Sequence, residues 1–174
     1  MMLTRPQAGE YAEHFAVYID KVPEGGLLEL LKTQPALAKE EWGSLTEEQG
    51  DYRYAEGKWS LKEVLGHISD TERVMSYRLL RISRGDATPL PGFDEELFVN
   101  SSTFGQQTVS ALLHDFSVVR EATLSLIRQL DDEAWLRQGT ASGVTVSARA
   151  LAYVIAGHAH HHLSMIRERY LQGE

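Results

Sequence analysis

Cysteine is absent from the 174 residues of this chain. Without it the chain can form no disulfide framework and can bind no metal ion through thiolates. It can also supply no nucleophilic thiol of its own, so any thiol chemistry needs a thiol from a substrate or cofactor. A metal ion in this protein would have nitrogen and oxygen ligands.

Positive charge is also scarce. Lys and Arg number 17 against 25 Asp and Glu, which gives a formal net charge of −8. Binding to a nucleic-acid backbone depends on a basic surface that releases counterions. Arg78, Arg81 and Arg84 form only a modest group, which we expect at the solvated end of a helix. The composition therefore predicts no nucleic-acid partner.

Long apolar runs are missing as well. No stretch approaches the roughly 20 apolar residues that span a bilayer, and the N-terminus lacks the basic and apolar segments of a signal peptide. We expect a soluble, cytoplasmic protein without a membrane partner. With 43% apolar residues, the chain is long enough for one domain, residues 1–174, with a core of its own.

The pattern that dominates the sequence is helical periodicity. Predicted helices cover about residues 7–22, 27–42, 61–84, 109–130 and 147–171. Pro35 is expected to break the second of these into two short pieces. Ser60 and Glu63 have the spacing of a capping box at the start of the third, and Thr46 with Gln49 offers another in the connection 43–58.

The long connection before residue 109 contains Pro89-Leu90-Pro91-Gly92, which cannot continue a helix. We interpret residues 89–98 as an ordered crossover loop with about one helical turn. Val144-Thr145-Val146 is too short to predict a sheet. Four substantial helices with one long crossover predict an all-α four-helix bundle, a fold whose core can hold metal sites built from facing helices.

Four of the seven histidines lie within residues 158–162. On a helical wheel His158 falls in the middle of the apolar face, and His162 lies roughly 40° away on the same face. His161 falls at the margin of that face and His160 on the opposite, solvent side. The wheel therefore selects His158 and His162 as the buried pair.

Two buried imidazoles need partners, because each unsatisfied polar group costs on the order of 1–3 kcal/mol. A divalent cation can satisfy both, since residues four apart point the same way and can share one ion. A polar network without metal, a solvated patch and a pH-sensing cluster are the alternatives. His161 is a competing ligand by its three-residue spacing, or it lines the site.

The third ligand stays open on periodicity alone. A catalytic metal site needs three protein ligands and an open position. The candidates are His14, His67, His114, Glu13, Asp70 and Glu72. Among these, His67 lies at the edge of an apolar stripe, where it is able to face a neighbouring helix.

Two segments carry a resemblance to a known family. Residues 58–73, with the sequence KWSLKEVLGHISDTER, and residues 156–162, AGHAHHH, resemble the helix-two and last-helix signatures of the DinB/YfiT-like proteins. Pro91-Gly92-Phe93-Asp94 and the spacing between the segments also resemble this family. The resemblance covers roughly residues 11–170, and the two histidine motifs together are quite specific. Glu95 stands where a glutamine often follows the aspartate in this family.

The resemblance implies a bundle of up-down-down-up type, often a homodimer, that holds nickel or zinc through His67, His158 and His162. It also implies a small-molecule substrate. Some members transfer low-molecular-weight thiols such as bacillithiol, mycothiol or glutathione to electrophiles. Our leading hypothesis is such a thiol transferase, in which the metal ion lowers the pKa of the thiol. Asp70, His161 or Glu95 could assist as catalytic groups. A metal-dependent hydrolase and a non-catalytic, stress-related metal-binding protein are the alternatives.

Overall fold

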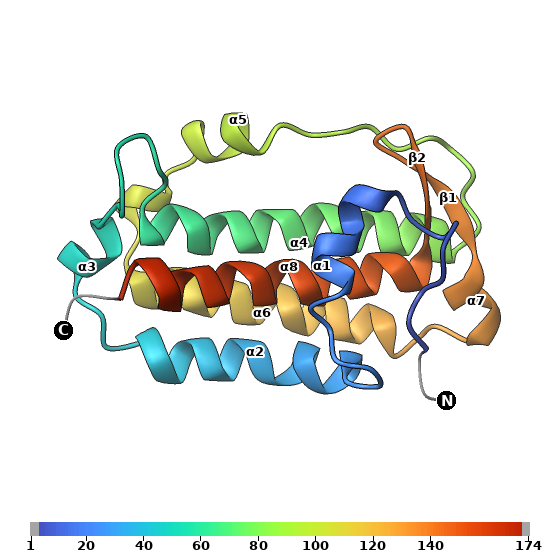
Figure 1. Cartoon of the computed structure of the whole chain (residues 1–174), viewed down its shortest axis with the longest axis horizontal. Helices are drawn as coiled ribbons and strands as arrows, with labels where there is room; N and C mark the ends of the chain where they lie inside the picture. Colours follow the sequence, from blue (N-terminus) through green and yellow to red (C-terminus); the bar gives the residue numbers. More distant parts are fainter. Residues whose placement is uncertain (1–3, 172–174) are drawn as a thin grey trace.

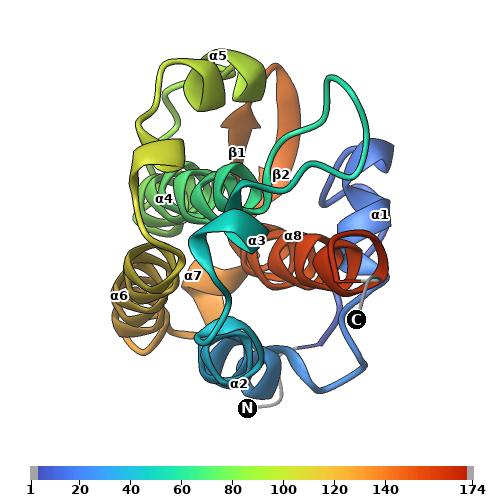
Figure 2. The same cartoon turned by 90° about the vertical axis from the view of Figure 1, so that its left-hand side faces the viewer.

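The computed structural model describes residues 4–171, whose four long helices form an antiparallel bundle. These are α2 (Leu27–Trp42), α4 (Leu61–Ser83), α6 (Val109–Ile127) and α8 (Ala148–Arg169). Both α4 and α2 pack against α6 and α8, which gives the square arrangement in Figure 2. In Figure 1, α4 and α6 run in one direction, whereas α2 and α8 run in the other. The predicted up-down-down-up four-helix bundle is confirmed.

Shorter elements join and cover the four helices. They are η1 (Glu13–Phe15), α1 (Ala16–Ile19), α3 (Glu47–Asp51), α5 (Glu95–Asn100), η2 (Phe104–Gln106), α7 (Asp132–Leu136), β1 (Gln138–Ala141) and β2 (Val144–Ser147). The predicted first helix over residues 7–22 is wrong in its length, because only η1 and α1 are helical there. The crossover does contain the expected helical turn, α5. None of the helices within residues 4–171 is both long and apolar enough to cross a membrane.

Capping boxes begin two helices, as the sequence predicts. The Ser60 hydroxyl accepts a hydrogen bond from the Glu63 backbone N–H, and the Glu63 carboxylate accepts one from the Ser60 N–H. Thr46 and Gln49 make the same reciprocal pair before α3. These bonds satisfy free N–H groups of the first turn, so the start of α4, one turn and a half before His67, is fixed locally.

The predicted break at Pro35 is wrong, since α2 continues through it. A proline inside a helix lacks the N–H that would bond the carbonyl four residues earlier. That carbonyl, on Leu31, instead accepts a hydrogen bond of 2.8 Å from Arg120 on α6. A neighbouring helix thus satisfies the group that the proline leaves free, and α2 stays intact.

A two-stranded antiparallel hairpin closes one end of the bundle, where residues 144–146 are too short a segment to predict a sheet. Ala141 pairs with Val144 across a two-residue turn, Ser142-Gly143. Both turn residues have positive φ, 53° and 78°, which matches the twist of a tight hairpin. Short strands are sufficient here because the turn chemistry, rather than strand length, sets the pairing.

Arg78 is buried rather than solvated, which corrects the prediction for the arginine group; Arg84 is exposed as expected. The Arg78 guanidinium donates to the Pro91 carbonyl, at 2.7 Å, and to the Ser142 hydroxyl, at 2.8 Å. Burial lowers the pKa of Arg78. This side chain therefore fastens the start of the crossover and the hairpin turn to α4.

The apolar core consists of two clusters, one toward each end of the bundle. Between them every long helix contributes one polar group to a buried network. Arg120 of α6 makes two hydrogen bonds of 2.8 Å to the carboxylate of Glu72 on α4. It also donates to the Gln34 side-chain oxygen of α2, at 2.7 Å, and Gln34 donates to the Ala156 carbonyl of α8, at 2.8 Å. On α8 this polar layer ends at Ala156, two residues before His158.

Candidate metal centre

Three histidines meet where α4 packs against α8. His67 comes from the second turn of α4, and His158 and His162 come from successive turns of α8. The Nε2 atoms of His67 and His158 lie 3.0 Å apart. One ring nitrogen from each of the three residues lies within 4.8 Å of the others. The side chains of His67 and His158 are each only 3% exposed.

Burial keeps these imidazoles neutral. Desolvation lowers the pKa of His67 to about 4. Desolvation first, and then the neighbouring His67 and His161, lower the pKa of His162 to about 3. The pKa of His158 lies well below its usual range for the same reasons. Neutral imidazole is the form that binds a metal ion, so the rings need lose no proton at pH 7.

The donor set fits a divalent metal ion. With metal–nitrogen bonds of about 2.0–2.1 Å, the nitrogen atoms of two ligands on a tetrahedral ion are about 3.4 Å apart. The observed separations are similar: 3.0 Å between the Nε2 atoms of His67 and His158, and at most 4.8 Å between the ring nitrogens that any two of the three residues offer. The Nδ1 atom of His162 is shielded from solvent and has no hydrogen-bond partner among residues 4–171. Such an orphaned nitrogen is costly unless something binds it. Three nitrogen ligands leave at least one coordination position for water or substrate.

The other candidates for a third ligand lie elsewhere. His14, Glu13 and His114 are exposed, and Glu72 is committed to Arg120. Of the helices that pack on α8, α4 is the one whose histidine, His67, contacts His158. The structure brings together the three histidines that the family resemblance implies.

The three predicted assisting residues differ in their surroundings. Asp70 is half-buried on α4 and forms an ion pair of 3.2 Å with Arg73; burial raises its pKa. His161 packs edge-on against the Tyr18 ring, with 5.8 Å between ring centroids. Glu95 lies in the first turn of α5, where burial, followed by the charges of Glu96 and Asp94, raises its pKa.

The wheel separates the α8 histidines less sharply than predicted. His158 is buried, but His160, expected on the solvent side, is half-buried like His161 and His162. The reason is that α1 packs on α8 in addition to α2 and α4. A wheel built on one sequence segment cannot show this extra cover.

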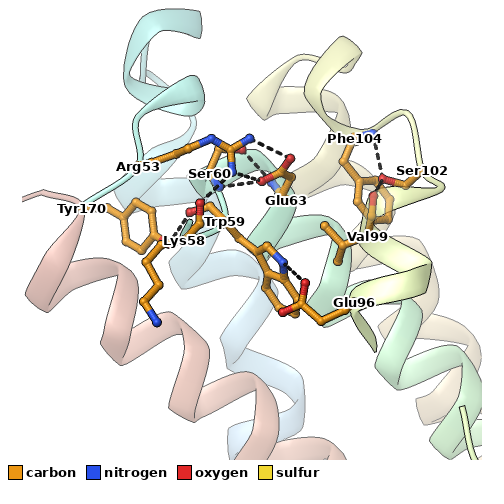
Figure 3. Close-up of polar contacts among 10 residues, drawn as sticks. All are labelled: Arg53, Lys58, Trp59, Ser60, Glu63, Glu96, Val99, Ser102, Phe104 and Tyr170. Atoms are coloured by element: carbon orange, nitrogen blue, oxygen red, sulfur yellow. Dashed lines mark hydrogen bonds and ion pairs between the residues drawn. The ribbon is translucent and has the colours of Figure 1, made fainter. Parts of the chain in front are cut away.

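Two aromatic residues that the sequence did not single out frame the histidines. The Trp59 ring lies 4.8 Å from that of His67, and the Tyr18 ring lies 5.2 Å from that of His158 in an edge-on contact. The Trp59 indole N–H donates to Glu96 on α5 over 3.3 Å (Figure 3). Trp59 stands just before the helix cap at Ser60, inside the segment 58–73 that resembles the family signature, but neither fact assigns it a place at the site.

Comparison with known proteins agrees with this fold. A family model described as the DinB superfamily matches residues 30–166. YfiT of Bacillus subtilis (strain 168), a proposed metal-dependent hydrolase, is 27% identical over 168 residues, which cover 92% of this chain and 90% of that protein. A protein of Oceanobacillus iheyensis, also a proposed metal-dependent hydrolase, is 27% identical over 128 residues, or 71% of this chain and 72% of the relative.

The solved structure of B. subtilis YfiT, described as having an unusual four-helix bundle topology, superimposes with a TM-score of 0.75. The superposition covers 94% of this chain and 89% of YfiT, with 19% sequence identity. A likeness at that identity concerns the fold, whereas the family model matches most of the sequence itself. The chain therefore belongs to the DinB superfamily, among its YfiT-like members.

Proposed function

We propose that this protein is a metal-dependent enzyme in which His67, His158 and His162 hold one divalent ion, nickel or zinc. The observation that carries the proposal is the convergence of three neutral imidazoles on one point. The names of the relatives, proposed metal-dependent hydrolases, support it independently. Nickel and zinc both accept imidazole ligands with open positions.

An ion held at this point would supply Lewis acidity, which lowers the pKa of a bound thiol or water molecule toward neutral pH. The chain's own residues would exclude bulk water and orient the ligands. Trp59 covers His67 and Tyr18 covers His158, while the Thr71 hydroxyl lies 3.5 Å from the second ring nitrogen of His67. Among the three assisting candidates, we assign proton transfer to the Glu95 carboxylate. Besides burial, its charge raises the pKa of Tyr18, the residue that contacts both His158 and His161. Asp70, by contrast, is engaged by Arg73.

Our leading proposal for the reaction is transfer of a low-molecular-weight thiol to a small electrophile. This proposal follows the family resemblance, and because the chain has no cysteine, the thiol would have to arrive with the substrate or as a cofactor. The second candidate is hydrolysis by an activated water molecule, which the names of the relatives favour. Both reactions use the same three histidines and the same open coordination position.

The experiment uses protein prepared without an affinity tag and loaded with zinc or nickel. Turnover of monochlorobimane is measured with bacillithiol, mycothiol and glutathione, and hydrolysis of p-nitrophenyl acetate is measured in parallel. We expect turnover with at least one thiol, its loss in His158→Ala or after chelation, and its retention in His114→Ala, which removes an exposed histidine. Ester hydrolysis without thiol transfer would select the hydrolase. Turnover rates that stay unchanged both after chelation and in His158→Ala would refute metal-dependent catalysis.

A further inference from the structure

A cavity of about 220 Å³ opens beside His162. It lies among the start of α4, the loop before it, α5 and the last turns of α8. Most of its wall is aromatic or apolar, supplied by Tyr54, Trp59, Val64, Met165 and Tyr170. The cavity is smaller than the roughly 300–1,000 Å³ typical of sites for drug-sized ligands, so it suits a small molecule.

The aromatic wall is preformed. The Tyr170 hydroxyl donates to the Trp59 carbonyl at 2.7 Å, and the Tyr54 ring packs edge-on against Tyr170 with 5.1 Å between centroids. On the other side, the Trp59 indole is tied to Glu96. Figure 3 shows the hydrogen bonds that join Trp59 to Tyr170 and to Glu96. A rigid wall lowers the entropy cost of binding a flat apolar group.

The loop that carries Lys58 is fixed as well. Arg53 donates to the Lys58 carbonyl at 2.7 Å and pairs with both carboxylate oxygens of Glu63, at 2.6 and 2.9 Å. In Figure 3 the Lys58 side chain extends away from this cluster. The structure thus neutralises Arg53 but leaves the Lys58 ammonium group directed elsewhere.

Lys58 lines the cavity and forms no ion pair with any described carboxylate. Arg169 adds a second cation behind Tyr54, with its guanidinium 5.2 Å from the ring centroid and 3.3 Å from the hydroxyl oxygen. Glu96 is the carboxylate in the lining, and it already accepts the Trp59 indole N–H. Lys58 is therefore the one lysine or arginine in the cavity lining, and it has no ion-pair partner among the described residues.

We propose that this cavity binds a small organic anion. Its carboxylate or similar group pairs with Lys58, its flat apolar body lies against Trp59 and Tyr170, and its reactive end points toward His162. This inference rests on the proposed function, because His162 joins the cavity to the metal centre. The substrate class is therefore an aromatic or apolar acid of about the size of a substituted benzoate.

The test measures binding by calorimetry with two matched probes, 4-methylbenzoate and the neutral 4-methylbenzyl alcohol, on metal-free and zinc-loaded protein. We expect the wild type to prefer the anion, and Lys58→Met to weaken anion binding about tenfold, the range of a charge-assisted hydrogen bond. Binding of the alcohol should be unchanged. Lys58→Arg should retain the preference, and Lys32→Met, which removes an exposed lysine on α2, should match the wild type.

Each outcome decides the question. Equal binding of the two probes, no binding of either at millimolar concentration, or equal losses in Lys58→Met and Lys32→Met would overturn the inference. Zinc uptake is measured on the same samples. If the protein prefers the anion but takes up no zinc, only the proposed function is wrong. If it takes up zinc normally but shows no preference for the anion, only the substrate class is wrong.

Discussion

At the residue scale, the three histidines of the candidate metal centre differ from ordinary surface histidines because their surroundings penalise the charged form. Burial lowers the pKa of His67 to about 4 and that of His162 to about 3. In the unfolded chain a histidine has a pKa near 6.5. Below that pH, the unfolded state therefore binds protons that the native state does not.

This difference predicts an acid-sensitive fold. In metal-free protein the free energy of unfolding should be highest above pH 6.5 and should fall by about 3 kcal/mol between pH 6.5 and 5, from His67 and His162 alone. His160 and His161, whose pKa values are also lowered, act in the same direction. Urea titrations in the presence of a chelator measure the effect. His162→Leu should flatten the slope, and a curve that is level over this window would contradict the account.

At the element scale, the four helices are tied together by the buried polar layer. Arg120 and Glu72 are 1% and 2% exposed at their side chains, and the same guanidinium satisfies the Leu31 carbonyl that Pro35 leaves free. Removing one partner of a buried ion pair leaves an uncompensated charge. The layer is therefore a point at which single and double substitutions should differ.

Arg120→Met should destabilise the protein by about 3–5 kcal/mol, because it leaves the buried Glu72 carboxylate and the Leu31 carbonyl without their hydrogen-bond donor. The double variant Glu72→Met/Arg120→Met should recover part of that loss, because no buried charge remains. Chemical denaturation of the four members of this cycle gives the coupling energy. Additive losses in the double variant would show that the pair does not act as a unit.

Helix α1 approaches α8 so closely that Gly157 has no room for a side chain. A Cβ atom there would lie 2.0 Å from the Tyr18 carbonyl oxygen. Gly157→Ala should therefore displace α1 or α8 next to His158, lower stability by about 2–3 kcal/mol and weaken zinc binding. Gly105→Ala, where a Cβ meets nothing within 4 Å, is the control. Thermal unfolding and zinc titration that fail to distinguish the two variants would contradict this packing argument.

Local signals account for what the sequence could predict. Ser60 and Ser147 begin the two helices that bear the histidines, and the apolar periodicity marks their length. His158 and His162 follow from the wheel, whereas His67 needed the family resemblance, because its meeting with α8 depends on tertiary packing. Continuity of α2 through Pro35 and burial of Arg78 were missed for the same reason: each depends on partners distant in the sequence, Arg120 in one case and Ser142 in the other.

At the scale of the whole molecule, the up-down-down-up topology makes α4 and α8 antiparallel neighbours. A histidine near the start of one helix therefore meets histidines in the second half of the other, and the long crossover brings α5 over the same end of the bundle. The homodimer implied by the family resemblance stays a prediction, for which a direct mass measurement in solution is the test.

The most direct test of the metal centre is elemental analysis of protein purified without an affinity tag and dialysed against zinc and nickel. The account predicts about one divalent ion per chain in the wild type and in His160→Ala, and a large loss of bound metal in His67→Ala, His158→Ala and His162→Ala. Circular dichroism of each variant verifies that it is folded. A folded wild-type protein that takes up no stoichiometric metal, or a His158→Ala variant that keeps it, would contradict the three-histidine site.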